Sequence, residues 1–114
     1  MNFKEKTAIV TGVSHGIGKA AALKFANLGA NLVLADKNEE GLKITAAAAR
    51  KIGAEVIALT LDVSDEQAVC EAVEKAEKAF GTIDILINNA GIYNTWGAFE
   101  DSDPESWKQK INVN

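Results

Sequence analysis

Short, continuous apolar runs alternate along the chain with longer segments whose apolar residues recur every three or four positions. The apolar runs predict strands that are buried on both faces, at residues 6–10, 31–35, 55–61 and 83–87. The helical spacing predicts helices at residues 16–28, 38–52 and 64–80. Because single helices separate the strands, we expect right-handed crossovers and one parallel sheet.

The ends of the predicted helices carry residues that favour helix termini. Asn38 is expected to cap the second helix, and Ser64 with Gln67 forms a capping-box pattern at the start of the third. A glycine follows each of the three helices, at Gly29, Gly53 and Gly81. One side of the first helix is expected to be its buried side and carries Ile17, Ala21, Phe25 and Leu28.

The four predicted strands match the order 3-2-1-4 of a Rossmann-like doubly wound α/β fold whose later strands are absent. At 114 residues the chain is expected to form part of a single domain, residues 1–114. A further helix is predicted from Pro104, and its apolar side, with Trp107 and Ile111, has no cap before Asn114. We therefore interpret the sequence as truncated. The unpaired edge expected at residues 83–87 favours homo-oligomers.

Candidate chemistry is concentrated after the first strand, in the glycine-rich segment that begins at Thr11. Gly12 would permit a tight turn, Gly16 the close approach of a ligand, and Gly18 close packing of the helix on the strand. The N–H groups at the start of the following helix carry partial positive charge. This pattern predicts a site for the pyrophosphate of a dinucleotide, and a plain strand-to-helix turn is the alternative interpretation.

Asp36 ends the second strand, near the spacing from the glycines that is typical of an acid binding the adenosine ribose. A carboxylate accepts hydrogen bonds from the ribose hydroxyls and repels a 2′-phosphate, so Asp36 favours NAD over NADP. The neighbours Lys37 and His15 weaken this preference without reversing it. A role as a strand-terminal turn residue is compatible with either cofactor.

Two further polar segments follow the third and fourth strands at the same edge of the predicted sheet. Asp62 either accepts a hydrogen bond from an adenine amino group or serves as a turn residue before Ser64. Asn88 and Asn89 follow an apolar strand, where amides are costly to bury unless their donors and acceptors are used. We expect one asparagine to tie the strands together and the other to face a ligand, with Gly91 leaving room for a flat ring or for neighbouring backbone.

Composition argues against several classes of function. The net charge of −4, the isoelectric point near 5.0 and the lack of a basic cluster argue against a nucleic-acid surface. No apolar run approaches the length of a membrane span, so we expect a soluble, cytoplasmic protein without membrane contact. The single cysteine, Cys70, has no companion for a disulfide or a metal site, and its apolar neighbours predict a small buried side chain.

Together these motifs resemble those of the short-chain dehydrogenase/reductase family. The matching segments stand in the family's order and spacing, and they are Thr11-Gly12-x-x-x-Gly16-Ile17-Gly18, Asp36, Asp62-Val63, Asn88-Asn89-Ala90-Gly91, and Trp107 with Ile111-Asn112-Val113-Asn114. The resemblance covers essentially all 114 residues. It implies a dinucleotide site on an α/β fold and an oxidoreductase activity in the parent protein.

The resemblance also implies a role for each matching residue. Thr11 would support the turn beneath the Asn-Asn-Ala-Gly loop. Asp36 would hold the ribose, and Asp62 and Val63 would contact adenine. The adenosine and phosphates would be surrounded by residues of the glycine segment, namely Gly12, Ser14, His15, Gly16, Ile17 and Gly18. The path to the nicotinamide ribose would be lined by Asn89, Ala90 and Gly91.

One residue of the family's catalytic tetrad has a counterpart here. Asn114 matches the asparagine that helps to hold a proton-relay water. The family's serine, tyrosine and lysine have none, since the only tyrosine, Tyr93, lies in the loop after the fourth strand and is followed four residues later by Gly97. A phenol without a cationic neighbour is a poor base at neutral pH. We therefore expect this chain to bind NAD(H) without catalysing hydride transfer.

These observations support two hypotheses. In the first, the chain is the N-terminal part of an enzyme that moves a hydride between the nicotinamide and a small-molecule secondary alcohol or carbonyl compound. In the second, it is a self-contained nucleotide-binding or oligomerisation module, because the residues that would contact the adenosine half are all present. Trp96 and Phe99 either touch a substrate or anchor their loop.

Overall fold

Seven elements alternate between strand and helix in residues 2–89, the part of the chain that the computed structural model describes, and their order confirms the prediction. The strands are β1 (Thr7–Thr11), β2 (Asn31–Asp36), β3 (Val56–Thr60) and β4 (Ile85–Asn88). The helices are α1 (Gly16–Asn27), α2 (Glu39–Ile52) and α3 (Glu66–Phe80). Within these residues no helix has the length and apolar character needed to cross a bilayer.

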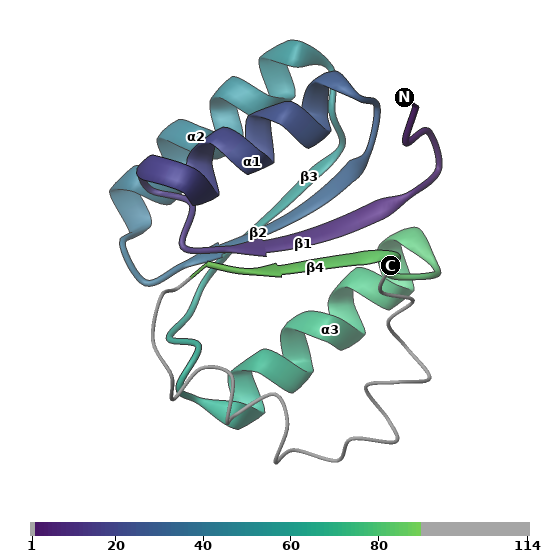
Figure 1. Cartoon of the computed structure of the whole chain (residues 1–114). Coiled ribbons are helices and arrows are strands. Elements are labelled where there is room, and N and C mark those ends of the chain that lie inside the picture. The colour runs from purple at the N-terminus through teal and green to yellow at the C-terminus, as the bar shows by residue number, and fades with distance from the viewer. Residues whose placement is uncertain (1, 90–114) are drawn as a thin grey trace.

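The four strands form one parallel sheet in the order β3-β2-β1-β4, as predicted. In this sheet Thr11 at the end of β1 pairs with Ala35 of β2 and with Asn88 of β4. The carboxyl ends of these strands therefore meet at one edge. α1 and α2 cover one face of the sheet, and α3 covers the opposite face (Figure 1). The arrangement is the first part of a Rossmann-like doubly wound α/β fold.

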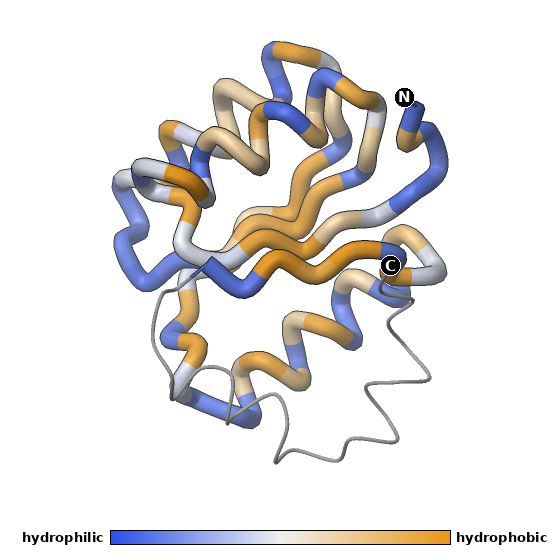
Figure 2. Tube along the Cα trace, in the orientation of Figure 1, coloured by the Kyte–Doolittle hydropathy of each residue, from blue (hydrophilic) through white to orange (hydrophobic). Residues whose placement is uncertain are grey.

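The strands are apolar on both faces because helices cover both faces (Figure 2). Leu32 and Leu34 of β2 pack on the α1–α2 side, whereas Val33 between them packs on the α3 side. The buried apolar residues on the α1–α2 side are Ala8, Val10, Val13, Ala22, Ala26, Ala30, Leu32, Leu34, Leu42, Ala46 and Ala49. Those on the α3 side are Ile9, Val33, Val63, Val69, Val73, Ala76 and Ile83.

Two predictions of burial need correction. Ile17 is 77% exposed, and the side that α1 buries consists of small residues, Gly18, Ala22 and Ala26. The physical reason is that α1 lies close to the end of β1, where a Cβ on Gly18 would overlap the carbonyl oxygen of Gly12. Only small side chains fit between helix and sheet there. On α3, Cys70 packs at the margin of the core and is half-buried rather than buried.

The starts of α2 and α3 are capped by side chains, one as predicted and one not. The Asn38 side chain accepts a hydrogen bond from the N–H of Gly41 at 3.0 Å, which confirms its role as the cap of α2. The cap of α3 is Asp65, so the capping-box prediction for Ser64 is wrong. The hydroxyl of Ser64 donates instead to Asp62 at 2.7 Å, and the helix begins after Asp65.

Each strand departs from its predicted bounds by one or two residues, and the largest departure is in β4, which begins at Ile85. The preceding residue, Asp84, is buried, and its carboxylate accepts a hydrogen bond from the N–H of Thr7 at 3.0 Å. The ammonium of Lys6 lies 3.8 Å from the other carboxylate oxygen. Asp84 therefore ties β4 to the start of β1 before the regular strand begins.

Candidate functional site

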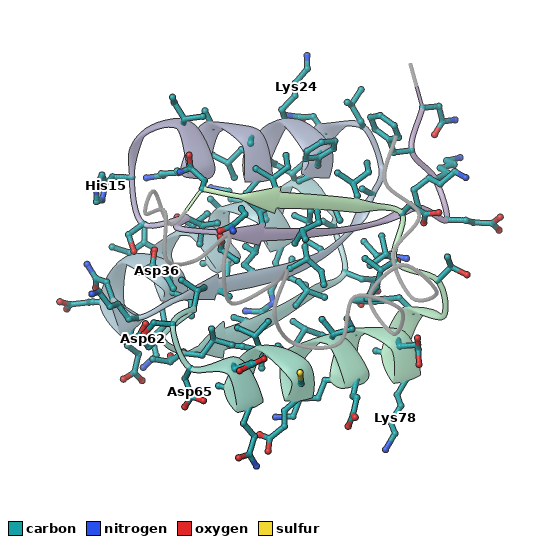
Figure 3. The ribbon with its side chains drawn as sticks, turned by 60° about the horizontal axis from the view of Figure 1, so that its bottom comes forward. His15, Lys24, Asp36, Asp62, Asp65 and Lys78 are labelled. Atoms are coloured by element: carbon teal, nitrogen blue, oxygen red, sulfur yellow. The ribbon has the colours of Figure 1, made fainter. Side chains whose placement is uncertain are left out.

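The candidate site lies at the carboxyl edge of the sheet, where turns lead from β1 to α1, from β2 to α2 and from β3 to α3. His15 in the first turn, Asp36 at the end of β2 and Asp62 in the third turn are found at the same end of the molecule, away from Lys78 (Figure 3). The topology therefore brings together the glycine segment and the two acidic residues that the sequence singles out. In open α/β sheets this edge is where ligands bind.

The glycine segment forms the turn from β1 to α1. Gly12 and Gly16 have φ angles of +67° and +65°, in the left-handed region that glycine adopts without a steric cost. A Cβ on Gly16 would meet none of the described atoms within 4 Å, so this position faces open space. A Cβ on Gly18 would lie 2.6 Å from Nδ2 of Asn89, besides its overlap with Gly12. Gly18 therefore allows the close packing of α1 on the end of β1 that the sequence predicts.

The N-terminus of α1 lacks the cap that the other two helices have. His15 occupies the N-cap position, but its side chain makes no capping hydrogen bond, and the first turn contains no acidic residue. Asn38 and Asp65 cap α2 and α3, and both of these helices have glutamates in the first turn. The first N–H groups of α1 thus carry partial positive charge that no side chain at its N-cap offsets, which is an arrangement that binds anions.

Asp36 joins this loop to the start of α2. One carboxylate oxygen accepts a hydrogen bond from the N–H of Ser14 at 3.0 Å, and the other from the N–H of Asn38 at 2.8 Å. Burial by itself would raise the pKa of Asp36, but hydrogen bonding from the N–H of Asn38 and from Ser14 outweighs it and holds the pKa below the ordinary value of 3.8. The side chain is therefore ionised at neutral pH and next to the glycine loop.

Asp62 and Val63 follow β3 and face different surroundings. Asp62 is exposed, and one of its carboxylate oxygens accepts hydrogen bonds from the N–H and the hydroxyl of Ser64, at 2.9 and 2.7 Å. These two hydrogen bonds lower the pKa of Asp62 below its ordinary value. Val63 is buried in the core on the α3 side. Contact of either residue with adenine stays a prediction.

The asparagines at the end of β4, Asn88 and Asn89, tie that strand to the end of β1. The hydroxyl of Thr11 donates to Oδ1 of Asn88 and accepts from the N–H of Asn89, both at 3.1 Å, which confirms the supporting role expected of Thr11. Nδ2 of Asn89 donates to the carbonyl oxygen of Gly12 at 3.2 Å. Both side-chain amides therefore tie β4 and the residue after it to the end of β1, and contact of Asn89 with a ligand stays a prediction.

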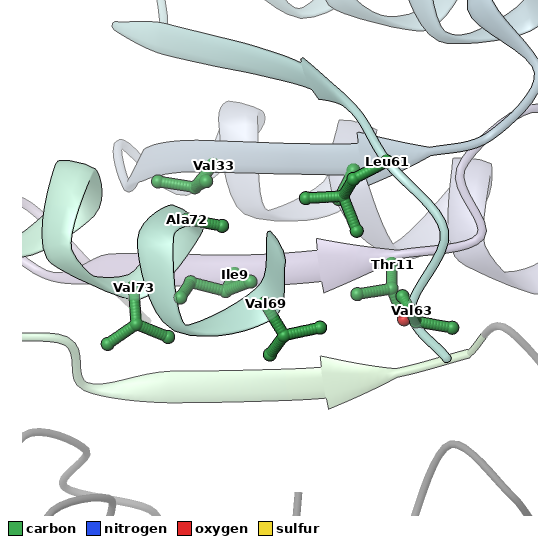
Figure 4. Close-up of a pocket in the computed structure, with 9 residues that line it drawn as sticks. Ile9, Thr11, Val33, Leu61, Val63, Val69, Ala72 and Val73 are labelled. Carbon is green, nitrogen blue, oxygen red and sulfur yellow. The ribbon is translucent and has the colours of Figure 1, made fainter. Parts of the chain in front are cut away.

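A small apolar cavity lies between α3 and the sheet, near this edge (Figure 4). Its volume of about 20 Å³ is close to that of a single water molecule, and a dinucleotide does not fit in it. The cavity is lined by Ile9, Thr11, Val33, Ala35, Leu61, Val63, Val69, Ala72 and Val73. The candidate site is therefore the surface of the sheet edge rather than this cavity.

Sequence reasoning missed two residues of α2 that contact the glycine loop. The hydroxyl of Thr45 donates to the carbonyl oxygen of Val13 at 2.7 Å, and a Cβ on Gly41 would lie 2.5 Å from the Ser14 side chain. Two signals in the sequence could have found them: a threonine at a core position of an alanine-rich helix, and a glycine inside a helix. Three of the predicted site residues, Ala90, Gly91 and Asn114, lie outside the described residues.

The chain matches a known protein family and curated proteins over most of its length. The profile of a family described as short chain dehydrogenase matches residues 6–114. Among curated proteins, the chain is 41% identical over 106 residues to estradiol 17-beta-dehydrogenase 11 from Rattus norvegicus, covering 92% of this chain and 36% of that protein. It is 45% identical over 110 residues to the uncharacterized oxidoreductase YxbG from Bacillus subtilis, covering 96% of this chain and 40% of that protein. The chain thus spans well under half the length of these relatives.

The chain is also similar in fold to solved structures. A short chain dehydrogenase/reductase from Burkholderia phymatum in complex with NAD superposes with a TM-score of 0.86 at 30% identity, covering 97% of this chain and 46% of that one.

Proposed function

Because the chain belongs to the short-chain dehydrogenase/reductase family, we propose that it forms the NAD(H)-binding part of such an enzyme. In the complete protein a hydride would pass between C4 of the nicotinamide and a secondary alcohol or carbonyl carbon. Residues 1–114 themselves would bind the cofactor without catalysing this step, because the family's tyrosine and lysine have no counterpart among them. The observation that carries the proposal is the uncapped N-terminus of α1 next to an ionised Asp36.

The proposed pose follows from the arrangement of the three turns. The pyrophosphate would lie over Gly12 and Gly16, where the positive φ angles keep side chains away and the first N–H groups of α1 offset its charge. Ile17, His15 and Ser14 flank that position. The adenosine would extend toward Asp36, with adenine near Asp62 and Val63, and the nicotinamide half would pass Asn89 and the residues that follow it.

We propose that the chain prefers NAD to NADP because Asp36 is negatively charged. Its carboxylate is ionised at neutral pH, and its oxygens lie where the ribose hydroxyls of the adenosine half would arrive. A 2′-phosphate there would meet a negative charge instead of a hydrogen-bond partner. The Burkholderia phymatum relative is in complex with NAD, which supports this preference. Lys37 follows Asp36 directly and is the residue that would favour NADP.

The direct test is an equilibrium titration of the purified chain with NADH, followed by fluorescence or calorimetry, with NADPH in parallel. We expect NADH to bind more tightly, and at 100 times its Kd to stabilise the fold by about 2.7 kcal/mol. Asp36→Ala should reduce the difference between the two cofactors. A chain that stays folded but binds neither dinucleotide would refute the proposal. A sequence downstream of Asn114 in the reading frame without Tyr-x-x-x-Lys would refute the parent activity.

A second candidate function is a self-contained nucleotide-binding or oligomerisation module. It is favoured by the position of β4, which within residues 2–89 pairs with β1 on one side only. An apolar strand with an open edge is a template for pairing with a second chain. Light scattering over a range of protein concentrations tests this: dimers that dissociate when proline replaces Ile87 would support it, whereas a monomer at high concentration would contradict it.

A further inference from the structure

We propose that Gly41 and Thr45, four residues apart on α2, are positioning residues for the glycine loop at residues 12–16, and that they set its affinity for the dinucleotide. The inference rests on the proposed function, since it assumes that the loop holds a pyrophosphate. Neither residue belongs to the turn that would contact the ligand. Each acts through a neighbour in the loop, Gly41 through Ser14 and Thr45 through Val13.

Thr45 holds the loop by a hydrogen bond. The residue is fully buried, and its hydroxyl donates to the carbonyl oxygen of Val13, which is also fully buried, at 2.7 Å. A threonine inside a helix ordinarily donates back to its own helix, whereas this hydroxyl reaches 32 residues back along the chain. Without it, the Val13 carbonyl would lose its donor in a place that water does not reach. The loop would then shift to recover a partner.

Gly41 holds the loop by close contact. A Cβ at this position would lie 2.5 Å from both Cβ and Oγ of Ser14, which is closer than atoms can approach. The backbone of α2 therefore lies directly against the Ser14 side chain, with no room for a side chain on the helix. Glycine inside a helix reduces stability by about 0.5–1 kcal/mol relative to alanine, so this contact has a cost in helix stability.

The contacts around Gly41 form a closed ring of residues that includes Asp36. Asp36 accepts from the N–H of Ser14 and of Asn38, and Asn38 in turn accepts from the N–H of Gly41. The contact of Gly41 with Ser14 then closes the ring. A methyl group that pushed Ser14 outward would therefore displace the N–H that Asp36 accepts. The residue proposed to bind the ribose and the loop proposed to bind the pyrophosphate would move together.

A double-mutant cycle tests the contact. Gly41→Ala should lower the affinity for NADH and for ADP by about tenfold, because a displaced loop affects the adenosine half that both ligands share. In a Ser14→Gly background the two atoms that the new methyl would overlap, Cβ and Oγ, are gone and only Cα remains nearby, at 3.2 Å, so the same change should alter affinity by less than about threefold. Equal losses in the two backgrounds, or no loss in either, would overturn the role of Gly41.

The hydrogen bond is tested by two substitutions at the same position. Thr45→Val keeps the shape and removes the hydroxyl, and should lower NADH affinity by about tenfold. Thr45→Ser keeps the hydroxyl and should restore most of the affinity. In the ligand-free protein, hydrogen exchange at the Ser14 amide should be faster in Thr45→Val than in Thr45→Ser. If the serine and valine variants bind and exchange alike, the role of Thr45 is overturned.

Two controls separate this inference from its alternatives. Ala49→Gly lies on the same buried side of α2, away from the loop, and should lower stability while NADH affinity stays within about twofold. A similar loss of affinity in this variant would show that helix stability, rather than loop position, is responsible. If the wild-type chain binds neither NADH nor ADP, the proposed function fails; if wild type binds and all variants bind equally, only the positioning inference fails.

Discussion

The three turns that lead from a strand into a helix on this sheet are alike in two cases and different in the third. After β2 and β3, an aspartate accepts the N–H of the residue two positions later, Asp36 from Asn38 and Asp62 from Ser64. An asparagine or aspartate then caps the helix. After β1, the corresponding position is Gly12, and the helix that follows has no capping side chain at its N-cap.

The comparison identifies where a ligand would take the place of a side chain. In two turns the protein supplies its own side-chain oxygens to the N–H groups of the next helix. In the first turn it supplies glycines and an open helix end, and the acid that accepts from the N–H of Ser14, Asp36, comes from the end of the neighbouring strand β2. The first turn is thus incomplete as a folding motif, and an anion would complete it.

Among the substitutions that test this comparison of the three turns, Gly18→Ala is expected to have the largest effect on NADH affinity and stability. The new Cβ would overlap the Gly12 carbonyl and press against Asn89, so α1 would have to move away from the loop. We expect NADH affinity to fall by more than about 100-fold and the free energy of unfolding to fall by about 1–3 kcal/mol. Titration and denaturant unfolding measure the two.

A matched control for this substitution is Gly53→Ala. Gly53 also has a positive φ, +116°, but its Cβ would meet none of the described atoms within 4 Å. This variant should lose about 1–2 kcal/mol of stability through backbone strain with unchanged NADH affinity. Equal affinities of Gly18→Ala and wild type would mean that the packing of α1 on the loop does not matter for binding.

The next largest effect is expected when the open turn is made to resemble the other two. His15→Asp would place a carboxylate at the N-cap of α1, where the backbone is already extended. We expect stability to rise by about 1 kcal/mol and NADH affinity to fall by about tenfold or more, because the carboxylate competes with and repels the pyrophosphate. His15→Asn separates the two effects, since it caps without charge and should weaken binding less. A carboxylate variant that binds NADH as well as wild type would contradict the assigned anion site.

We call the turns after β2 and β3 closed, because a side chain caps the helix that follows each of them, and the turn after β1 open. A smaller effect is expected from removing the cap of one closed turn. Asp65→Ala removes the cap of α3 and leaves the N–H of Ala68 without its partner. The free energy of unfolding should fall by about 1 kcal/mol, while NADH affinity should stay within about twofold, because Asp65 is not among the residues proposed to contact the cofactor and its side chain accepts from Ala68 of its own helix. Thermal unfolding with and without NADH measures both. A large loss of binding would show that the three turns are not independent.

How much of this comparison the sequence predicts depends on the range of the contacts involved. The order of strands and helices and the cap at Asn38 follow from local patterns, and the sequence predicts them. Ile17 is misplaced because its exposure depends on how closely α1 approaches β1, and periodicity does not encode that distance. Ser64 is misassigned because its hydroxyl has a competing partner in Asp62.

The contacts of Gly41 and Thr45 with the loop lie beyond sequence reasoning for a similar reason. They join residues about thirty positions apart, and only the packing of α2 beside the first turn brings them together. A glycine in a helix and a threonine among alanines indicate that some contact exists, but not with which segment. The carboxyl edge of the sheet follows from topology, whereas the support of its first loop follows from the folded structure alone.

The smallest effect concerns the acids of the two closed turns and appears as a dependence of stability on pH. The folded state lowers the pKa of Asp36 below 3.8, so its contribution to stability is complete above that pH. As the pH falls below 3.8, the unfolded chain takes up a proton first, and the contribution is lost by the time the pH passes the folded pKa. Asp62 is lowered in the same direction by Ser64. Acid unfolding of Asp36→Asn and Asp62→Asn, measured by circular dichroism between pH 5 and pH 2, should therefore be less steep than that of the wild type, and more so for both together. If acid unfolding is as steep in the double variant as in the wild type, these backbone hydrogen bonds do not stabilise the closed turns, and the distinction between closed and open turns loses its energetic basis.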